Sequence, residues 1–392
     1  MKCTYLAICY FHGNYGSVLQ AFATQEYLKK IGVPNRTIRI DGLKKHIKIR
    51  KVKYFLTQIL NKDVVSDKYS YLRLWFMRKT DAALNRDVST RKSIFKEFVE
   101  QNFDLTEPFA SFAELGRACE QNCRCVLVGS DQLWLPANIE AGYYTLSFAP
   151  DTVKKVSYAT SFGVSEIPAG QARKAAGFLR KFEVVSVREL SGQKIVDGLT
   201  GVVPPVVCDP VLLFTADEWA RYCPTERKYK NKYILCYLLG PEKKYYEWVK
   251  TLRDTTGCKV VALLKLDAYM PESSIAADYK PFDIDPFGFV DLIRNAEYIC
   301  TDSYHATLFS LLFHKKVFVF KRFPKESTMS TNARLESLFT LLGMDGGGGG
   351  DAFTAYQTPL SRSLNVTYDY EAIDAALAGF RKKSASFLRR AL

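Results

Sequence analysis

The sequence predicts an α/β protein with two domains that face each other across a cleft. Short apolar runs alternate with amphipathic helical patterns along the whole chain, which is typical of mostly parallel sheets covered by helices. The length of 392 residues is long for one domain and suits two. Near 200–215 the stretch GLTGVVPPVVCDP interrupts the alternation with two adjacent prolines, so the domain boundary is expected there.

The predicted organisation follows from this boundary. The first domain spans 1–204 and the second spans 205–345, while 346–392 forms a Gly-rich linker and a C-terminal helix. The run DGGGGGD at 345–351 cannot hold regular structure because glycine leaves the backbone too free. The apolar periodicity of 370–392 predicts the last helix.

The individual elements are predicted from apolar runs and helical periodicity. Strands are expected at 4–11, 124–129, 155–163, 183–189, 205–213, 232–240, 258–264, 298–302 and 316–320. Helices between them are expected at 17–32, ending at Gly32, and at 244–256 and 288–296.

A basic, helical insert interrupts the first domain from 43 to about 100. LKKHIKIRKVK at 43–53 carries six Lys or Arg and no acid. One helical face behind it is formed by Val52, Phe55, Leu56, Ile59 and Leu60. Two interpretations stay open: an excursion that packs on the first domain, and a patch at 43–79 that docks on an anionic membrane leaflet.

Composition restricts the partners. The net charge of +14 favours an anionic partner, such as nucleic acid, a membrane surface or a phosphorylated substrate. No nucleic-acid-binding motif is present, so no nucleic-acid partner is expected. No apolar run reaches 18 residues, and no signal peptide is recognised. Ten Cys scattered through apolar runs suit a reducing cytoplasm, and a cytoplasmic protein is predicted.

Polar clusters follow the predicted strands, where parallel sheets bind their ligands. They are HGNYGS (12–17), GSDQLW (129–134), SYATSFG (157–163), SVRE (186–189), DP (209–210) and TDSYH (301–305). In TDSYH a helix is expected to begin near His305 or Ala306, leaving free N–H groups for a phosphate. Ser303 can cap this helix and bind phosphate, and His305 can donate to phosphate or move a proton. A plain helix cap is the alternative.

Two more clusters supply candidate ligands. GSDQLW places Ser130 and Asp131 at the mouth of the cleft, with Gln132 and Trp134 able to bind and stack on a sugar ring. Arg188 ends an apolar strand, where a buried guanidinium needs an anion partner, either a ligand or its neighbour Glu189. A cap, a turn or an internal ion pair remains the alternative for each.

Metal binding is not expected. Asp283 and Asp285 form a D-x-D pattern ahead of a helix, where capping explains them. Three cysteines lie close together in the sequence, at Cys119, Cys123 and Cys125, but no fourth ligand is evident. The four histidines form no metal-binding pair.

Taken together, these stretches resemble the polysaccharide pyruvyl transferase family. The resemblance covers about 1–343 and is carried by NYGSVLQAFATQ (14–25), VGSDQLW (128–134), YATSFG (158–163), SVRE (186–189), CDPVLL (208–213), TDSYHATLFS (301–310) and NARLESLFTLLG (332–343). It implies a GT-B-like arrangement of two Rossmann-like domains, with a C-terminal helix that returns to the first. It also implies transfer of the enolpyruvyl unit of phosphoenolpyruvate onto a sugar, forming a cyclic pyruvate ketal and releasing phosphate. Tyr304 stands where related motifs often carry Phe, Leu or another residue.

The resemblance gives roles to the candidate residues. His305 is expected to be the general acid, oriented by Asp302, and Asp131 the hydroxyl base or sugar ligand. Arg188 is expected to bind the donor's anionic groups. The expected substrate-binding residues are Asn14, Gly16, Ser130, Gln132, Trp134, Ser161, Asp302, Ser303, Arg322, Asn332 and Arg334. No metal or cofactor is expected, and phosphoenolpyruvate serves as the donor substrate.

The acceptor is expected to be a sugar of a surface polysaccharide, such as a capsule or exopolysaccharide, or of its lipid-linked precursor. The basic insert would then hold the enzyme at the inner leaflet. The strongest alternative is a GT-B glycosyltransferase that uses a nucleotide sugar, with Glu272 or Asp278 as candidate ribose ligands. A saccharide-binding module without catalysis is a third interpretation.

Overall fold

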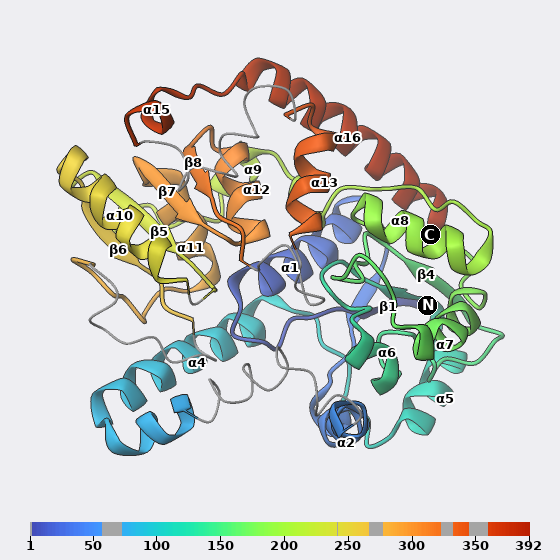
Figure 1. The fold of residues 1–392 in the computed structure, drawn as a ribbon. Coiled ribbons are helices and arrows are strands. Elements are labelled where there is room, and N and C mark those ends of the chain that lie inside the picture. The colour runs from blue at the N-terminus through green and yellow to red at the C-terminus, as the bar shows by residue number, and fades with distance from the viewer. Residues whose placement is uncertain (1, 57–72, 241, 266–276, 323–331, 345–359) are drawn as a thin grey trace.

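Two parallel sheets form the framework of the molecule (Figure 1). The structure is a computed structural model that describes residues 2–56, 73–240, 242–265, 277–322, 332–344 and 360–392. The predicted α/β class, with two sheets and alternating helices, is confirmed. Part of the insert, Glu272 and the Gly-rich linker lie outside the described residues.

The first sheet has the strand order β2-β1-β3-β4, all parallel. Its strands are β1 (Cys3–Ala7), β2 (Asn35–Thr37), β3 (Cys123–Val128) and β4 (Lys154–Ser157). The predicted strands at 183–189 and 205–213 are wrong, because only single bridges form there, at Val184, Val187 and Val206. Pro210 has no backbone N–H to offer a sheet, and it starts the one-turn helix η2 (Pro210–Leu213) instead.

The second sheet has the order β6-β5-β7-β8, again all parallel. Its strands are β5 (Tyr233–Tyr237), β6 (Lys259–Ala262), β7 (Tyr298–Thr301) and β8 (Lys316–Val319). Each falls inside a predicted apolar run, which confirms these four predictions.

Helix α1 (Tyr15–Lys30) lies at the centre of the molecule, between the two sheets (Figure 1). Almost all its residues are buried, because it packs on both halves of the molecule. Here the first half means the first sheet and the second half means the second sheet, each with the helices and loops around it. It ends just before Gly32, whose φ of 76° allows the chain to turn. The other helices around the sheets are α5 (Phe112–Asn122), α6 (Pro136–Ala141), α7 (Ala169–Leu179), α8 (Leu190–Thr200), α9 (Ala216–Ala220), α10 (Lys243–Thr256), α11 (Pro286–Asn295), α12 (Tyr304–Leu312), α13 (Ala333–Leu341) and α15 (Leu360–Asn365).

The C-terminal helix α16 (Tyr370–Ala391) runs back from the second half of the molecule to the first (Figure 1). Ser384 Oγ accepts a hydrogen bond from the Cys208 N–H at 2.8 Å, and Arg381 Nε donates to the Leu212 carbonyl at 2.6 Å. This return is the one that the resemblance implied. The domain limits 1–204 and 205–345 stay predictions.

The described part of the insert is helical, as predicted. It comprises α2 (Lys44–Leu56), a helix at 73–80 and α4 (Ala82–Asn102). The predicted apolar face of α2 is not a single packed face, because Val52 is 47% exposed while Phe55 lines a cavity. Ile59 and Leu60 lie outside the described residues.

Arg91 ties the insert to the second half of the molecule. Its side chain extends from α4, and its guanidinium donates to three backbone carbonyls: Leu264 at 2.8 Å, Phe282 at 3.4 Å, and Pro281. The residue is 1% exposed. The insert therefore bridges the two halves rather than packing on the first alone.

Candidate active site

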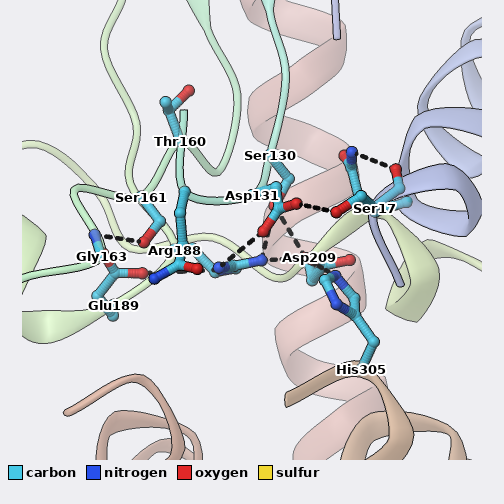
Figure 2. A network of polar contacts seen from close by, with 12 residues as sticks. Ser17, Ser130, Asp131, Thr160, Ser161, Gly163, Arg188, Glu189, Asp209 and His305 are labelled. Atoms are coloured by element: carbon cyan, nitrogen blue, oxygen red, sulfur yellow. Dashed lines mark hydrogen bonds and ion pairs between the residues drawn. The ribbon is translucent and has the colours of Figure 1, made fainter. Parts of the chain in front are cut away.

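Asp209 is the centre of a buried polar network that joins the two halves of the molecule (Figure 2). Its Oδ1 accepts a hydrogen bond from the Val211 N–H at 3.1 Å, which caps η2. Its Oδ2 accepts from Ser130 Oγ and Arg188 Nη1, both at 2.8 Å, and lies 3.3 Å from His305 Nε2. His305 comes from the second half and the other two residues from the first, so this one carboxylate joins the polar clusters of both.

The charge of Asp209 is maintained by its partners. Burial alone would raise the pKa of this carboxyl, but His305 and Arg188 outweigh burial and hold the pKa well below its ordinary value. Asp209 is therefore ionised at neutral pH and stays an acceptor for all three donors.

Arg188 has one bonded and one unbonded edge. Its side chain is 0% exposed, and Nη1 is bonded to Asp209. Its Nε and Nη2 share the other edge and make no hydrogen bond to any residue that the structure describes. The nearest carboxylate oxygens are too distant, with Glu189 Oε2 3.7 Å from Nε and Asp131 Oδ1 3.9 Å from Nη2. Such an edge fits a bidentate anion.

A second arginine, Arg334, lies close to Arg188. The guanidiniums of Arg188 and Arg334 lie over the Tyr304 ring, at 4.4 Å and 5.7 Å from its centroid. Burial, together with the nearby charges of Arg188 and Arg322, lowers the pKa of Arg334 to about 9. The surroundings of Arg334 thus disfavour its positive charge, and a bound anion would relieve that cost.

Helix α12 begins at Tyr304, and Ser303 is its N-cap, as predicted. Ser303 Oγ accepts a hydrogen bond from the Ala306 N–H at 3.4 Å. His305 lies in the first turn and is 5% exposed. Its ring lies against Gly16 of α1 so closely that a Cβ on Gly16 would come within 2.2 Å of His305 Nδ1. Gly16 therefore serves the site by having no side chain.

Asp131 lies where the network opens into a cavity. Its φ of 78° is unusual for a residue other than Gly and turns the chain sharply after β3. Ser17 Oγ donates to its Oδ2 at 2.5 Å. Burial alone would raise the pKa of Asp131, but His305, Arg188 and Ser17 hold it below its ordinary value. Asp131 is therefore a charged acceptor that can orient a ligand hydroxyl.

The cavity has a volume of about 850 Å³ and is lined by both halves of the molecule. Asn14, Asp131 and Gln132 line it from the first half, and Tyr237 and Leu239 line it from the second. The insert lines it with Lys44, Lys51, Phe55, Arg91, Lys92 and Lys96. The predicted cleft is therefore present, and basic side chains lie along its wall.

The structure corrects four predicted roles, those of Trp134, Ser130, Ser161 and Asp302. Trp134 cannot stack on a sugar, because it is 0% exposed, packs on Phe162 and donates to the Tyr144 carbonyl. Ser130 is bonded to Asp209, and Ser161 accepts from the Gly163 N–H, so both hydroxyls are used inside the protein.

Asp302 does not orient His305. Its carboxylate accepts from the Leu239 and Gly240 N–H groups at 2.8 Å and 2.7 Å, and Arg322 Nε lies 3.4 Å from it. Asp302 instead fixes the loop after β5 and places Arg322.

Three other predicted residues lie either in the wall of the cavity or at the start of α13. Asn14 and Gln132 line the cavity, and Asn14 also caps α1 by accepting from the Ser17 N–H at 3.2 Å. Asn332 is buried at the start of α13, next but one to Arg334.

Sequence reasoning missed Asp209 and Ser17 as site residues. Asp209 was visible as a polar residue after an apolar run, but its partners lie 21, 79 and 96 residues away. Ser17 was part of HGNYGS, and only the fold places it against Asp131.

The described residues contain neither a cluster that could hold a metal ion nor a helix that could cross a membrane. Within them, no group of His, Cys, Asp or Glu could hold a metal ion. Asp285 caps α11 by accepting from the Gly288 N–H at 2.6 Å, as predicted. No helix in the described ranges is long and apolar enough to cross a membrane.

Residues 14–322 match the family described as polysaccharide pyruvyl transferase, so the chain belongs to that family. Membership makes it a transferase that acts in polysaccharide pyruvylation. The match spans every residue of the Asp209 network. No curated protein sequence matches the chain at a significant level.

Three solved structures with similar folds are the glycosyltransferase SnogD, the protein MurG and a UDP-GlcNAc 2-epimerase. SnogD from Streptomyces nogalater is 11% identical with a TM-score of 0.44, and MurG from Acinetobacter baumannii is 10% identical with a TM-score of 0.44. A UDP-GlcNAc 2-epimerase from Neisseria meningitidis is 12% identical with a TM-score of 0.45. Each match covers 100% of both chains. At these values the likenesses carry no argument about activity.

Proposed function

We propose that the protein moves the enolpyruvyl group of phosphoenolpyruvate onto a sugar, forms a pyruvate ketal and releases phosphate. The observation that carries the proposal is the unbonded, buried Nε–Nη2 edge of Arg188. A buried guanidinium edge without an acceptor costs free energy, which a phosphate or carboxylate of the donor would recover. Arg334 and Arg322 supply further positive charge beside it, and the first turn of α12 supplies free N–H groups.

The chemistry can be assigned to residues on both sides of this site. Asp131 binds and orients an acceptor hydroxyl, whose oxygen adds to C2 of the donor while C3 gains a proton. His305, held by Asp209, acts as the general acid for C3 or for the leaving phosphate. A second hydroxyl then replaces phosphate at C2. One hydroxyl proton ends on the new methyl group and the other leaves with phosphate. No cofactor takes part.

The cavity suits a saccharide acceptor attached to a phosphorylated carrier. Gln132 Nε2 is buried and has no hydrogen bond within the described part of the chain, so it can bind a sugar oxygen. Lys44, Lys51 and Lys92 also line the cavity, where they can bind the phosphates of a lipid-linked precursor.

Replacing Arg188 by Lys is expected to weaken phosphoenolpyruvate binding about 10- to 100-fold, because Lys keeps the charge but loses the two-point edge. Calorimetric titration of phosphoenolpyruvate into the wild type and Arg188→Lys measures the change. Arg180→Lys is the matched control, since Arg180 is an exposed arginine on the same domain. No detectable wild-type binding, or equal affinities in all three proteins, would contradict the proposal.

Titration of nucleotide sugars into the wild type tests the glycosyltransferase alternative. Its candidate ribose ligand Asp278 accepts from the Val260 N–H at 2.8 Å and pairs with Lys259 at 3.1 Å, so its carboxylate is already used. Tight binding of a nucleotide sugar, with none of phosphoenolpyruvate, would favour a glycosyltransferase.

We also propose that α2 docks on an anionic membrane at the mouth of the cavity. Lys45, Lys48, Ile49 and Val52 are exposed and recur at i, i+3, i+4 and i+7, so they share one helical face. On a helical wheel this face is about 90° from the side of α2 that carries the cavity-lining Lys44 and Lys51. A membrane bound there would present a lipid-linked acceptor to the cavity.

The double variant Lys45→Glu/Lys48→Glu is expected to lower binding to vesicles rich in phosphatidylglycerol at least 10-fold, since each basic residue near such a surface contributes about 1 kcal/mol. Cosedimentation measures this. Lys228→Glu/Lys232→Glu is a control with the same charge change on partly or fully exposed residues of the second half. Equal binding by both double variants would sink the membrane proposal.

A further inference from the structure

Glu189 is a buried acid that the proposed reaction has not yet used. It stands at the N-cap position of α8, but its side chain makes no capping hydrogen bond. It is 1% exposed, and neither carboxylate oxygen has a hydrogen bond of good geometry from the residues the structure describes. An acid at this position ordinarily binds the helix N–H groups. Figure 2 shows Glu189 beside Arg188 instead.

Glu189 flanks the edge of Arg188 that the donor would occupy. Its Oε2 is 3.7 Å from Arg188 Nε, and Asp131 Oδ1 is 3.9 Å from Nη2 at the other end of the edge. An anion bound to both nitrogens would therefore contact a carboxylate on either side. Like charges so close in a buried site repel strongly, so one carboxylate must be neutralised as the anion binds.

The two carboxylates differ in their environments. Asp131 is held ionised by His305, Arg188 and Ser17, which keep its pKa below the ordinary value. Burial raises the pKa of Glu189, and Arg188, Ser161 and Arg334 offset this only in part. Glu189 is therefore the carboxylate that accepts a proton more readily.

The charged and titratable groups around Glu189 come from three elements. Arg188 precedes it in the chain, Arg334 faces it from α13 and Tyr304 faces it from α12. The loop at 161–162 adds the Ser161 hydroxyl and the Phe162 N–H nearby. Burial alone would lower the pKa of Arg188, but Tyr304 and Asp209 outweigh burial and raise it, so Arg188 keeps its charge. Tyr304, whose pKa burial raises, stays neutral. Because the pKa of Arg334 is lowered to about 9, the binding experiment stays at or below pH 8, where this arginine is still mostly charged. Glu189, whose pKa burial raises, is thus the group of this set that takes up a proton most readily.

We propose that Glu189 takes up a proton when the donor anion binds at Arg188, so that donor binding is coupled to protonation of this one side chain. The inference rests on the proposed function, because it needs the donor at that edge. Its consequence is a donor complex that holds an acid beside the bound phosphate or carboxylate, where the reaction requires protons. Donor affinity then falls as the pH rises through the titration of Glu189.

The test compares phosphoenolpyruvate affinity from about pH 5.5 to 8 in the wild type and Glu189→Gln. The amide keeps the size of the side chain and cannot ionise. The two proteins are expected to bind phosphoenolpyruvate equally at the acid end of the range. Once the pH exceeds the point at which Glu189 loses its proton, the affinity of the wild type should fall relative to that of Glu189→Gln by up to tenfold per pH unit. Comparing the two proteins removes the titration of the donor, which is the same in both experiments.

Glu183→Gln is the matched control, an exposed glutamate on the same segment paired with Lys154 at 3.1 Å, and it should follow the wild type. In the wild type, calorimetry at pH 8 in two buffers of different ionisation enthalpy should also show proton uptake on donor binding. The Glu189→Gln variant should lack this uptake. If the variant does not fold, the wild-type measurement alone still tests the inference. Binding with parallel pH profiles and no proton uptake would overturn the inference and leave the proposed function standing. Absence of wild-type binding at every pH would overturn both.

Discussion

Replacing Asp209 by Asn is expected to lower the free energy of unfolding by about 3–5 kcal/mol, the range for removing one partner of a buried ion pair. Arg188 would keep its buried charge and lose the one carboxylate among the described residues that accepts a hydrogen bond from it, because Glu189 and Asp131 lie 3.7 Å and 3.9 Å away. The loss should be measured by denaturant unfolding at pH 7. The same change should weaken phosphoenolpyruvate binding, because Arg188 and His305 both take their positions from Asp209.

The pH dependence of this loss has a definite sign. The pKa of Asp209 is lower in the folded protein than its ordinary value of about 4. Its stabilising contribution is therefore complete above about pH 4 and falls as the pH drops below that value, where the unfolded chain binds the proton first. The stability gap between wild type and Asp209→Asn should narrow in this acid range.

Asp254→Asn provides the comparison for an exposed carboxylate. Asp254 is 55% exposed and pairs with Arg253 at 3.1 Å at the surface, where ion pairs contribute little. The unfolding midpoint of this variant should stay close to that of the wild type. If Asp209→Asn behaved like Asp254→Asn, Asp209 would not be the centre of the network.

The site was predictable to the extent that it follows from parallel strands. The carboxyl ends of neighbouring parallel strands share one edge of a sheet, so the polar residues after β3 in the first sheet and after β7 in the second were each expected at the ligand-binding edge of their own sheet. The sequence therefore brought Asp131, Arg188 and His305 into one candidate site. It could not show which carboxylate would join them, because Asp209 lies between a segment that makes a single bridge, at Val206, and the one-turn helix η2.

Side-chain direction was the other unpredictable feature. Trp134 follows Asp131 by three residues, and the positive φ of Asp131 redirects the chain after β3. The indole then enters the aromatic core formed with Phe162 and Phe178. Arg91 illustrates the same limit, since its three acceptors are backbone carbonyls of the other half of the molecule. Carbonyl groups carry no sequence signature, so a helical insert could be predicted while its bridge across the cleft could not.

Replacing Gly16 by Ala is expected to damage the site although alanine favours helices. Gly16 lies in the first turn of α1, where its φ is ordinary and a Cβ would be tolerated by the helix itself. The obstacle is His305, because the new methyl carbon would lie 2.2 Å from Nδ1 and 2.5 Å from Cγ. One of the two elements must move, and overpacking of this kind costs about 1–3 kcal/mol of unfolding free energy.

The functional loss from Gly16→Ala should exceed the loss of stability, because displacing His305 also breaks its contact with Asp209. Gly198→Ala is the matched control. Gly198 lies within helix α8 with nothing within 4 Å of a new Cβ, so alanine there should stabilise the protein by about 0.5–1 kcal/mol. Denaturant unfolding and phosphoenolpyruvate titration of both variants measure the contrast. If Gly16→Ala were as stable as Gly198→Ala and bound the donor like the wild type, the close packing of α1 on His305 would have no part in building the site. If it loses donor binding while its fold persists, the position of the imidazole relative to Asp209 is what the donor site requires.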